Sequence, residues 1–360
     1  MKKIKGIIIG VGIMILGTAM AGCAGKSEQL EFAAKLGNGI NIGNSLDATN
    51  LRDYEPQASE LDYEVFWGNP NITVQQFEAI RDAGFESVRI PVTWEDHMDA
   101  DGTISVEWME RVAEVVDMAL EQDLYVVLDT HHEEWLNLEV EHQDAICAQY
   151  ETVWTQIAER FADYDEHLLF EGMNEPRLRD SEHEWDAGTS ELRAMVNRLN
   201  TLFVEAVRNT GGNNTSRYLL ICPYATNTET EALEELTVPD GNIIVAVHMY
   251  KPYSFCQDKE GTAGWNKSQP EDTEEIDRIF SDLKRLFIDK KIPVVITEYG
   301  CEDKNNEEAR AAWVSYYRKC ADEAGISCMW WDDGSGYQIF DRNTGECVYE
   351  ELLEALTENK

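Results

Sequence analysis

Residues 167–176 read His-Leu-Leu-Phe-Glu-Gly-Met-Asn-Glu-Pro, and the fold is predicted from the pattern of this stretch. Its first part, His167–Met173, is a mostly apolar run of strand length. Asn174 and Glu175 follow at once. Burying polar side chains directly after an apolar run costs folding free energy unless they are hydrogen-bonded or serve a function. The junction therefore predicts a strand whose carboxyl end carries a functional site.

Apolar runs of this kind recur along the chain, each followed by a longer stretch with helical periodicity. They are separated by roughly 30 to 50 residues, which leaves room for one helix between neighbouring parallel strands. The predicted strands are Gly39–Asn44, Ser87–Val92, Leu124–Thr130, His167–Met173, Tyr218–Cys222, Ile243–Met249, Pro293–Glu298 and Ser327–Trp331.

One of the intervening helices has clear start and stop signals. Thr73 can cap the N-terminus, Gln76 completes a capping box, and Gly84 ends the helix. Residues 107–122 and 307–323 carry similar apolar stripes. Alternating strands and helices fit either a closed barrel or an open, doubly wound sheet.

The polar residues distinguish these two folds. In a barrel of eight parallel strands the carboxyl ends converge on one face, where such enzymes keep their active sites. An open sheet would spread the same residues along an edge. We therefore predict a single-domain α/β protein, a (β/α)₈ TIM barrel over residues 31–360, from polar and aromatic residues at Asn44, Arg89, His131, His132, Asn174, Glu175, His248, Tyr250, Glu298, Trp330 and Trp331.

Composition narrows the class of partner. The 360 residues carry a formal net charge of −39, which argues against nucleic acid and favours a neutral ligand. Apart from Cys23, the cysteines are odd in number and show no CxxC spacing, so the sequence predicts neither a disulfide framework nor a metal site. We expect a monomer without a cofactor.

The N-terminus has the features of an export signal. Lys2, Lys3 and Lys5 precede an apolar run over residues 7–20, too short for a stable membrane span. Met20-Ala21-Gly22-Cys23 then resembles a bacterial lipobox, although Leu is usual where Met20 stands. We expect a signal peptide over residues 1–22, lipidation of Cys23, a tether over 23–30, and a protein anchored at the outer face of the cell membrane. An ordinary signal peptide, giving a secreted protein, is the alternative.

Two carboxylates stand out at strand ends, Glu175 in Met-Asn-Glu-Pro and Glu298 in Thr-Glu-Tyr-Gly. Hydrolysis of a glycosidic bond needs one carboxylic acid to protonate the leaving oxygen and a second carboxylate to act at the anomeric carbon. A barrel can place its fourth and seventh strands on opposite sides of one cleft. The pair therefore predicts a glycosidase.

The chain resembles glycoside hydrolase family 5, a retaining family of barrel enzymes, and in particular its subfamily four of endoglucanases and xyloglucanases. The similarity runs from Gly37 to about Asp341. The matching segments are Gly-Asn-Ser-Leu-Asp-Ala (43–48), Trp-Gly-Asn-Pro (67–70), Val-Arg-Ile-Pro-Val-Thr-Trp (88–94), His-His-Glu (131–133), Asn-Glu-Pro (174–176), His-Met-Tyr-Lys-Pro-Tyr (248–253), Thr-Glu-Tyr-Gly (297–300) and Trp-Trp-Asp (330–332).

This resemblance implies retaining, endo-acting hydrolysis of β-1,4-linked glucans: cellulose-like chains, mixed-linkage β-glucan or xyloglucan. It assigns Glu175 as the acid/base and Glu298 as the nucleophile. It further implies that Asn174 binds the sugar 2-hydroxyl and that Arg89 keeps Glu298 ionised. An adjacent arginine is expected to lower a carboxyl pKa, whereas a desolvated Glu175 can stay protonated.

The resemblance also implies substrate contacts. His248 and Tyr250 match a His-x-Tyr motif whose tyrosine hydroxyl lies near the nucleophile. Adjacent strand residues point to opposite sides, so we favour His131 over His132 as the closer substrate ligand. Trp331 matches the tryptophan that stacks beneath a glucosyl ring, with Trp330 as the alternative. Asn44 is the remaining substrate-binding candidate; Trp67, Trp135 and Trp265 can equally bind sugar or pack.

Other functions are kept as alternatives. Ile40, Asp333 and Cys301 depart from the family pattern and leave the preferred glucan open. Activity on mannan or xylan is an alternative, because loops set the preference for the backbone sugar. A surface lipoprotein that only binds carbohydrate would not need two positioned glutamates. A metal-dependent hydrolase is suggested by His131, His132 and His248, but the His-x-His spacing that places two ligands on one face is missing.

Overall fold

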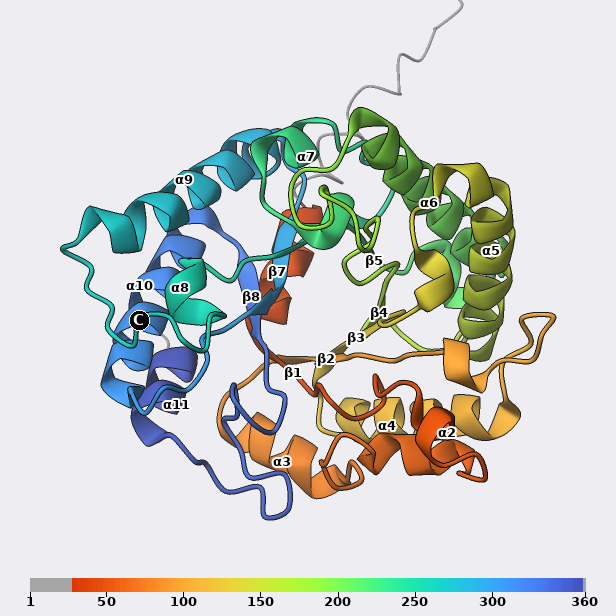
Figure 1. The fold of residues 1–360 in the computed structure, drawn as a ribbon, viewed down its shortest axis with the longest axis horizontal. Coiled ribbons are helices and arrows are strands. Elements are labelled where there is room, and N and C mark those ends of the chain that lie inside the picture. Colours follow the sequence, from red (N-terminus) through yellow and green to blue (C-terminus); the bar gives the residue numbers. More distant parts are fainter. Residues whose placement is uncertain (1–27, 359–360) are drawn as a thin grey trace, which may run out of the picture.

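The computed structural model describes residues 28–358, in which eight parallel strands close into a barrel in the order β1 to β8. Helices surround the strands (Figure 1). This confirms the predicted (β/α)₈ TIM barrel. The strands are β1 Asn38–Asn41, β2 Ser87–Ile90, β3 Tyr125–Asp129, β4 Leu168–Glu171, β5 Leu219–Ile221, β6 Ile243–His248, β7 Val294–Tyr299 and β8 Ser327–Trp330.

All eight predicted strands are present, with ends within three residues of the predicted bounds. Seven of the eight predicted strands extend one to three residues too far at the carboxyl end, where the chain has already left the sheet. The predicted helix after Thr73 is confirmed: the Gln76 side chain accepts a 3.3 Å hydrogen bond from the Thr73 N–H, and Gly84 adopts a φ of +98° just beyond the helix end. The α-helices are α2 Leu51–Tyr54, α3 Val74–Asp82, α4 Val106–Leu120, α5 Gln143–Arg160, α6 Ser190–Asn209, α7 Thr230–Glu234, α8 Tyr253–Cys256, α9 Pro270–Leu286, α10 Glu307–Ala324 and α11 Glu350–Thr357.

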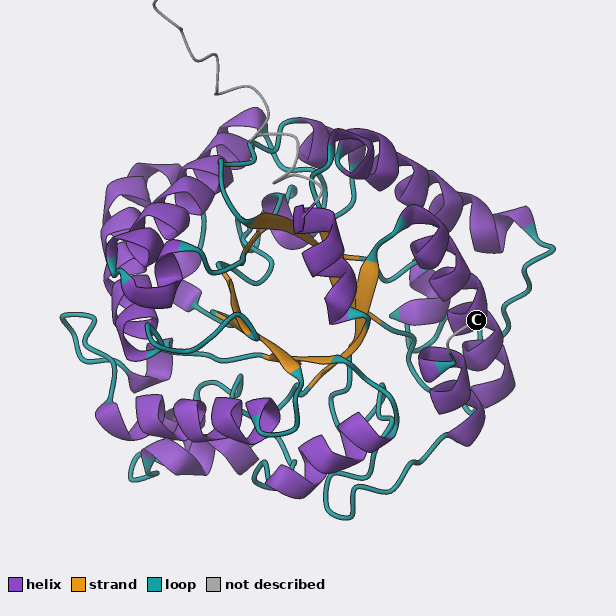
Figure 2. Ribbon diagram, turned by 180° about the vertical axis from the view of Figure 1, so that it is seen from behind, coloured by secondary structure: helices purple, strands orange, loops and turns teal. Residues whose placement is uncertain are grey.

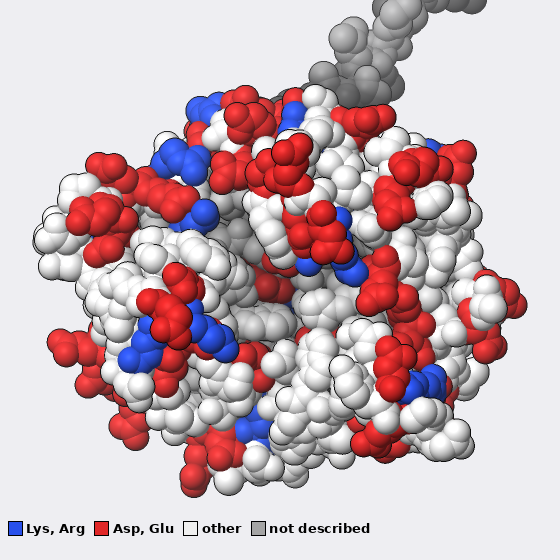
Figure 3. Space-filling view, viewed as in Figure 1, with Lys and Arg blue, Asp and Glu red and all other residues white. Residues whose placement is uncertain are grey.

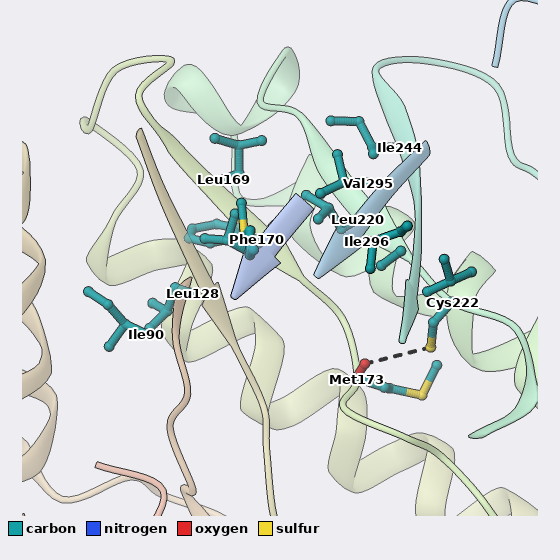
Figure 4. Close-up of a cluster of buried hydrophobic side chains, with 14 of the residues drawn as sticks. Ile90, Leu128, Leu169, Phe170, Met173, Leu220, Cys222, Ile244, Val295 and Ile296 are labelled. Atoms are coloured by element: carbon teal, nitrogen blue, oxygen red, sulfur yellow. Dashed lines mark hydrogen bonds between the residues drawn. The ribbon is translucent and has the colours of Figure 1, made fainter. Parts of the chain in front are cut away.

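The hydrophobic core lies within and around the barrel. Most strand residues are buried on both faces, as expected of a parallel sheet covered by helices. Figure 4 shows part of this core, with Leu169 and Phe170 of β4 near Leu220 of β5. Cys222 is a buried free thiol whose Sγ lies 3.6 Å from the Met173 carbonyl oxygen.

The first described residues close the amino-terminal end of the barrel. Residues 28–33 are helical, and Phe32 stacks on Tyr218 with ring centroids 3.6 Å apart. The Ala33 carbonyl accepts a hydrogen bond from Ser327 at the start of β8. Seen from behind, a short helix lies across the barrel opening (Figure 2).

Part of the predicted N-terminal organisation lies outside the described residues. The signal peptide and Cys23 fall there. Residues 28–30, which the sequence assigned to the tether, are helical, and Leu30 packs against the core. Among residues 28–358, no helix combines the length and the apolar character needed to cross a membrane.

Candidate active site

A buried arginine organises the carboxyl end of the barrel. Arg89, on β2, is fully buried, and its guanidinium lies 2.7 Å from Asp129 Oδ2, 2.5 Å from Glu171 Oε2 and 2.6 Å from Glu298 Oε1. It also donates to Asn174 Oδ1 at 2.9 Å. One cation thus joins β2, β3, β4 and β7 and fixes the position of two predicted site residues.

Glu298 lies within β7 and is almost enclosed, with 7% of its side chain exposed. Besides its contact with Arg89, it accepts a 2.9 Å hydrogen bond from the Tyr250 hydroxyl. The pairing of β6 and β7 shifts register between Val247 and His248, which lie opposite this part of β7. Such irregularities redirect side chains next to active sites.

Glu175 lies beyond the end of β4, and 22% of its side chain is exposed. Its backbone has a φ of +44°, a left-handed conformation that costs energy for a residue other than glycine. Two hydrogen bonds hold it: the Glu175 N–H donates to Thr226 Oγ1 at 3.0 Å, and Arg177 donates to the Glu175 carbonyl at 2.9 Å. The strain is therefore compensated locally.

The two glutamates face each other. A carboxylate oxygen of Glu175, one of Glu298 and a ring nitrogen of His248 all lie within 4.8 Å of one another. His248 Nδ1 is 2.9 Å from Glu175 Oε1 and 3.4 Å from Glu298 Oε2. Retaining glycosidases have carboxyl groups about 5–5.5 Å apart, and inverting enzymes about 6.5–9.5 Å. The separation here belongs to the retaining class.

Burial raises the pKa of both glutamates above the ordinary value. For Glu298, nearby His248 and Arg89 and the Tyr250 hydrogen bond oppose this rise. For Glu175, Arg177 and Arg89 oppose it. Arg89 lowers the pKa of Glu298, as expected, but burial has the larger effect and the net shift is upward.

Trp331 and His131 form one wall of the site. Their rings are parallel, with a 3° interplanar angle and centroids 5.8 Å apart. The Trp331 ring lies against Gly43, where a Cβ atom would come within 2.6 Å of it. His131 Nδ1 pairs with Asp129 at 2.7 Å. Trp330, the alternative to Trp331, is fully buried and donates to the Tyr337 carbonyl at 2.8 Å.

The other candidates differ in exposure. His132 lies beside His131, with ring centroids 4.4 Å apart, and contacts Trp67, which is 38% exposed. Asn44 is partly exposed in a left-handed conformation, and its N–H donates to Asp47.

Of the three tryptophans left open by the sequence, Trp67 is the most accessible. Trp135 is partly buried and donates to Glu133 at 2.9 Å. Trp265 is buried against Tyr316, and its indole donates to the Asp272 carbonyl. Packing therefore explains Trp265, and Trp67 remains the strongest candidate for an outer sugar contact.

Two donor sets in the site have the composition of metal ligands. One is Glu175, His248 and Glu298; the other is Asp47, His131 and His132. Asp47 already accepts hydrogen bonds from the Asn44 and Ser45 N–H groups, and His131 Nδ1 is paired with Asp129. Hydrogen bonding within the protein accounts for how these groups are placed.

Sequence reasoning missed residues that support or extend the site. Asp129 and Glu171 hold Arg89, and Asn41 accepts from it at 3.1 Å. The sequence could have pointed to these three residues, since each is a polar residue inside an apolar strand run.

A cavity of about 680 Å³ next to Glu175 is lined by residues from distant loops, among them Trp185, Asn227, Tyr253 and Tyr337. Figure 3 shows a hollow at the centre of this otherwise strongly acidic face.

Comparison with known proteins agrees with this geometry. The family described as cellulase (glycosyl hydrolase family 5) matches residues 48–336. Endoglucanase A of Ruminococcus albus is 41% identical over 358 residues, which cover 96% of each chain. A GH5-4 broad specificity endoglucanase from Clostridium acetobutylicum is 36% identical, with a TM-score of 0.86 over 92% of this chain and 99% of that one. A GH5 xyloglucan-specific endo-β-1,4-glucanase from a metagenomic library, in complex with cellotriose, is 37% identical, with a TM-score of 0.86 and the same coverage.

A closed (β/α)₈ barrel with two opposed glutamates at its carboxyl end defines the class of barrel glycosidases. The match over residues 48–336 is more specific. The chain belongs to glycosyl hydrolase family 5, the cellulase family.

Proposed function

We propose that this protein cleaves β-1,4-linked glucans internally and with retention of the anomeric configuration. The observation that carries the proposal is the approach of Glu175 and Glu298 to within 4.8 Å in a site whose wall includes the parallel rings of Trp331 and His131. This spacing suits a covalent glycosyl-enzyme intermediate. The aromatic faces of Trp331 and Trp67 suit the C–H faces of glucosyl rings. Two of the similar proteins are named as an endoglucanase and as a xyloglucan-specific endo-β-1,4-glucanase.

Glu298 is the nucleophile in this mechanism. Its carboxylate attacks the anomeric carbon while the glycosidic C–O bond breaks. Arg89 and the Tyr250 hydroxyl hold one oxygen each, so the other lone pairs can point at the sugar. Both contacts favour the ionised carboxylate, and in a coupled pair that shares one proton they leave the proton on Glu175.

Glu175 is the acid/base. It gives its proton to the leaving oxygen, then accepts a proton from the water that attacks the glycosyl-enzyme and releases Glu298. Asn174 is held by Arg89 next to both glutamates, where it can bind the sugar 2-hydroxyl. The wall beside the sugar that is attacked is formed by Trp331, His131, His132 and Asn44.

The test is a product survey on carboxymethyl-cellulose, mixed-linkage β-glucan, xyloglucan, mannan and xylan. An internal cut lowers the viscosity of a glucan solution early, when few reducing ends have formed, and short oligomers appear first. Release of monosaccharide alone would contradict the endo mode. Preference for mannan or xylan would retain the mechanism and change the substrate.

We further propose that Cys23 carries a lipid that holds the enzyme at the outer face of the cell membrane. The support is the basic and apolar run that precedes Met20-Ala21-Gly22-Cys23. Residues 28–33 lie at the end of the barrel opposite the site, so an anchor there leaves the cleft free. Cys23→Ala should move the protein from the membrane fraction to the medium, whereas Cys347→Ala should not. Unchanged membrane attachment of Cys23→Ala would refute the anchor.

A further inference from the structure

A buried ion pair lies behind the sugar-binding wall, and the mechanism above gives it no role. Arg342, in the loop that follows β8, has 7% of its side chain exposed, and Asp332 has 1%. Arg342 Nη2 lies 2.9 Å from Asp332 Oδ1, and its Nε lies 3.3 Å from the same oxygen. Asp332 directly follows Trp331 in the chain. The ion pair is therefore one residue away from the aromatic side chain of the wall.

The guanidinium holds the backbone of Asp332 as well as its carboxylate. Arg342 Nη2 also donates to the Asp332 carbonyl at 2.8 Å, and this carbonyl accepts a second hydrogen bond from the Gly43 N–H at 2.9 Å. These bonds together fix the peptide plane and the side chain of one residue. The peptide just after Trp331 is thus held by an arginine that lies ten residues beyond Asp332 in the sequence.

The surroundings of Trp331 leave little room for movement. Its N–H donates to the Tyr299 carbonyl of β7 at 2.8 Å. Its ring lies against Gly43, where a Cβ atom would come within 2.6 Å of the ring atoms. On the wall the ring is parallel to that of His131. A small shift of the Trp331 backbone would therefore press the ring against Gly43 or change its alignment with His131.

The loop after β8 depends on the same carboxylate. From residue 331 to residue 349 the chain forms no helix and no strand. Asp332 accepts hydrogen bonds from the N–H groups of Gly334 at 2.8 Å, Ile339 at 2.8 Å and Phe340 at 3.4 Å. A carboxylate that is buried in this way needs a cation to offset the loss of its hydration. Arg342 supplies this cation and so keeps the loop folded around Asp332.

We propose that Arg342 is a positioning residue for the reaction, which acts through Asp332 to hold Trp331 where its ring can stack on the sugar that is attacked. The inference deepens the proposed function and rests on the role that Trp331 has in it. A displacement of about 1 Å at a group that orients a substrate can cost about 10²-fold in rate. An ion pair behind the wall can therefore control kcat.

The first experiment is a double-mutant cycle on kcat with mixed-linkage β-glucan. Arg342→Gln removes the charge and should lower kcat about 10- to 100-fold. Trp331→Ala removes the ring and should lower kcat at least as much. Adding Arg342→Gln to Trp331→Ala should then cost less than about 2-fold more, because no ring is left to position. If the two factors multiply instead, Arg342 acts independently of Trp331 and the inference is overturned.

Arg342→Lys tests the geometry of the guanidinium separately from its charge. Lysine keeps a cation beside Asp332, but it lacks the planar fork that binds the carboxylate and the carbonyl together. Its kcat should lie between those of the wild type and Arg342→Gln. If Arg342→Gln does not fold, the cycle with Trp331→Ala is carried out with Arg342→Lys, and the same two outcomes decide it.

Arg217→Gln is the matched control for lost stability. Arg217 is 3% exposed and donates to the carbonyls of Leu168 at 2.6 Å and Phe161 at 2.9 Å, at the amino-terminal end of the barrel and away from the site. Its loss should lower the Tm, as the loss of Arg342 should, but leave kcat unchanged at temperatures well below unfolding. An equal fall in kcat for Arg217→Gln and Arg342→Gln would show that lost stability alone explains the effect, and would overturn the inference.

The outcomes separate this inference from the proposed function. If Trp331→Ala keeps the wild-type kcat, the ring does not act on the sugar and the inference fails, whereas Glu175 and Glu298 keep their roles. Failure of the proposed endo mode would show instead in the product survey, as release of monosaccharide alone. The coupling between Arg342 and Trp331 would still be measurable on the same glucan.

Discussion

The two glutamates of the site sit in unlike surroundings. Glu298 lies inside a strand, is 7% exposed, and is held by Arg89 and Tyr250. Glu175 lies in a loop with left-handed backbone, is 22% exposed, and faces a cavity open to solvent. A nucleophile must be ionised and fixed, whereas an acid/base must exchange protons with a leaving group and then with water. The barrel supplies the first environment and its loops supply the second.

The largest expected effect follows from removing either carboxyl. Glu298→Ala should lower kcat about 10⁵-fold or more on every substrate, because no glycosyl-enzyme can form. Glu175→Ala should lose about 10²- to 10⁴-fold on polysaccharide and much less on a substrate with an activated leaving group. Steady-state rates on carboxymethyl-cellulose and on a dinitrophenyl cellobioside measure both.

Added azide should rescue these two variants with opposite stereochemistry. In Glu298→Ala, azide attacks from the vacated face and gives an α-glycosyl azide. In Glu175→Ala, azide attacks the glycosyl-enzyme and gives the β-azide. The reverse pattern, read by NMR of the products, would exchange the two roles.

A smaller effect on kcat is expected from removing the Tyr250 hydroxyl, which donates to Glu298. Tyr250→Phe removes one hydrogen bond to a charged oxygen, worth about 1.5–3 kcal/mol, so kcat should fall about 10- to 100-fold. The same bond opposes the rise in the Glu298 pKa, so its loss should raise that pKa. Because the nucleophile must be ionised, the acid limb of the pH profile should move to higher pH.

The pH dependence of wild-type activity tests the comparison between Glu298 and Glu175 without any mutation. Burial raises the pKa of both carboxyls. Activity should therefore fall on the acid side as Glu298 gains a proton, at a pH above the ordinary glutamate value of about 4.5. It should fall on the basic side as Glu175 loses its proton. The two limbs report apparent pKa values of the pair. An acid limb below pH 4 would contradict the stated direction for Glu298.

The smallest expected effect is on stability and concerns Glu133, a further buried glutamate. It shows how burial shifts the pKa of a carboxyl whose main partners are N–H groups. Glu133 accepts from the Trp94 N–H and the Trp135 indole, and burial raises its pKa to about 8. A raised carboxyl pKa means that the folded state binds the proton more tightly, so stability is full below about pH 4.5 and is lost as pH rises toward 8. Thermal unfolding between pH 5 and 8 should show this decline.

Glu133→Gln serves as the comparison for that decline. It cannot ionise, and when its amide oxygen accepts from the Trp94 N–H, its NH2 group faces the Trp135 indole and cannot accept from it. Its free energy of unfolding should therefore start about 1 kcal/mol lower at pH 5 and fall less as the pH rises. Parallel curves for the two proteins would exclude Glu133 as the cause.

The barrel was predictable because most strands are apolar runs that end in polar or aromatic residues, as in residues 167–176. Glu175 and Glu298 were predictable for the same reason, and the structure brings them together. The position of Trp185 was not predictable, because it lies in an irregular loop. Its contact with Arg177 is seen only in the folded structure. The net rise of the Glu298 pKa could not be predicted, because the sequence shows neither the burial of this carboxyl nor that Arg89 is shared among three carboxylates.

The central claim is that Glu298 attacks the sugar while Glu175 transfers the proton. A dinitrophenyl 2-deoxy-2-fluoro-β-cellobioside should react once and leave a stable glycosyl-enzyme, because the fluorine slows its hydrolysis more than its formation. Mass spectrometry of the digested protein should find the added disaccharide on the peptide that contains Glu298, and on Glu298 itself. Label on Glu175, or on another side chain of the site, would contradict the account.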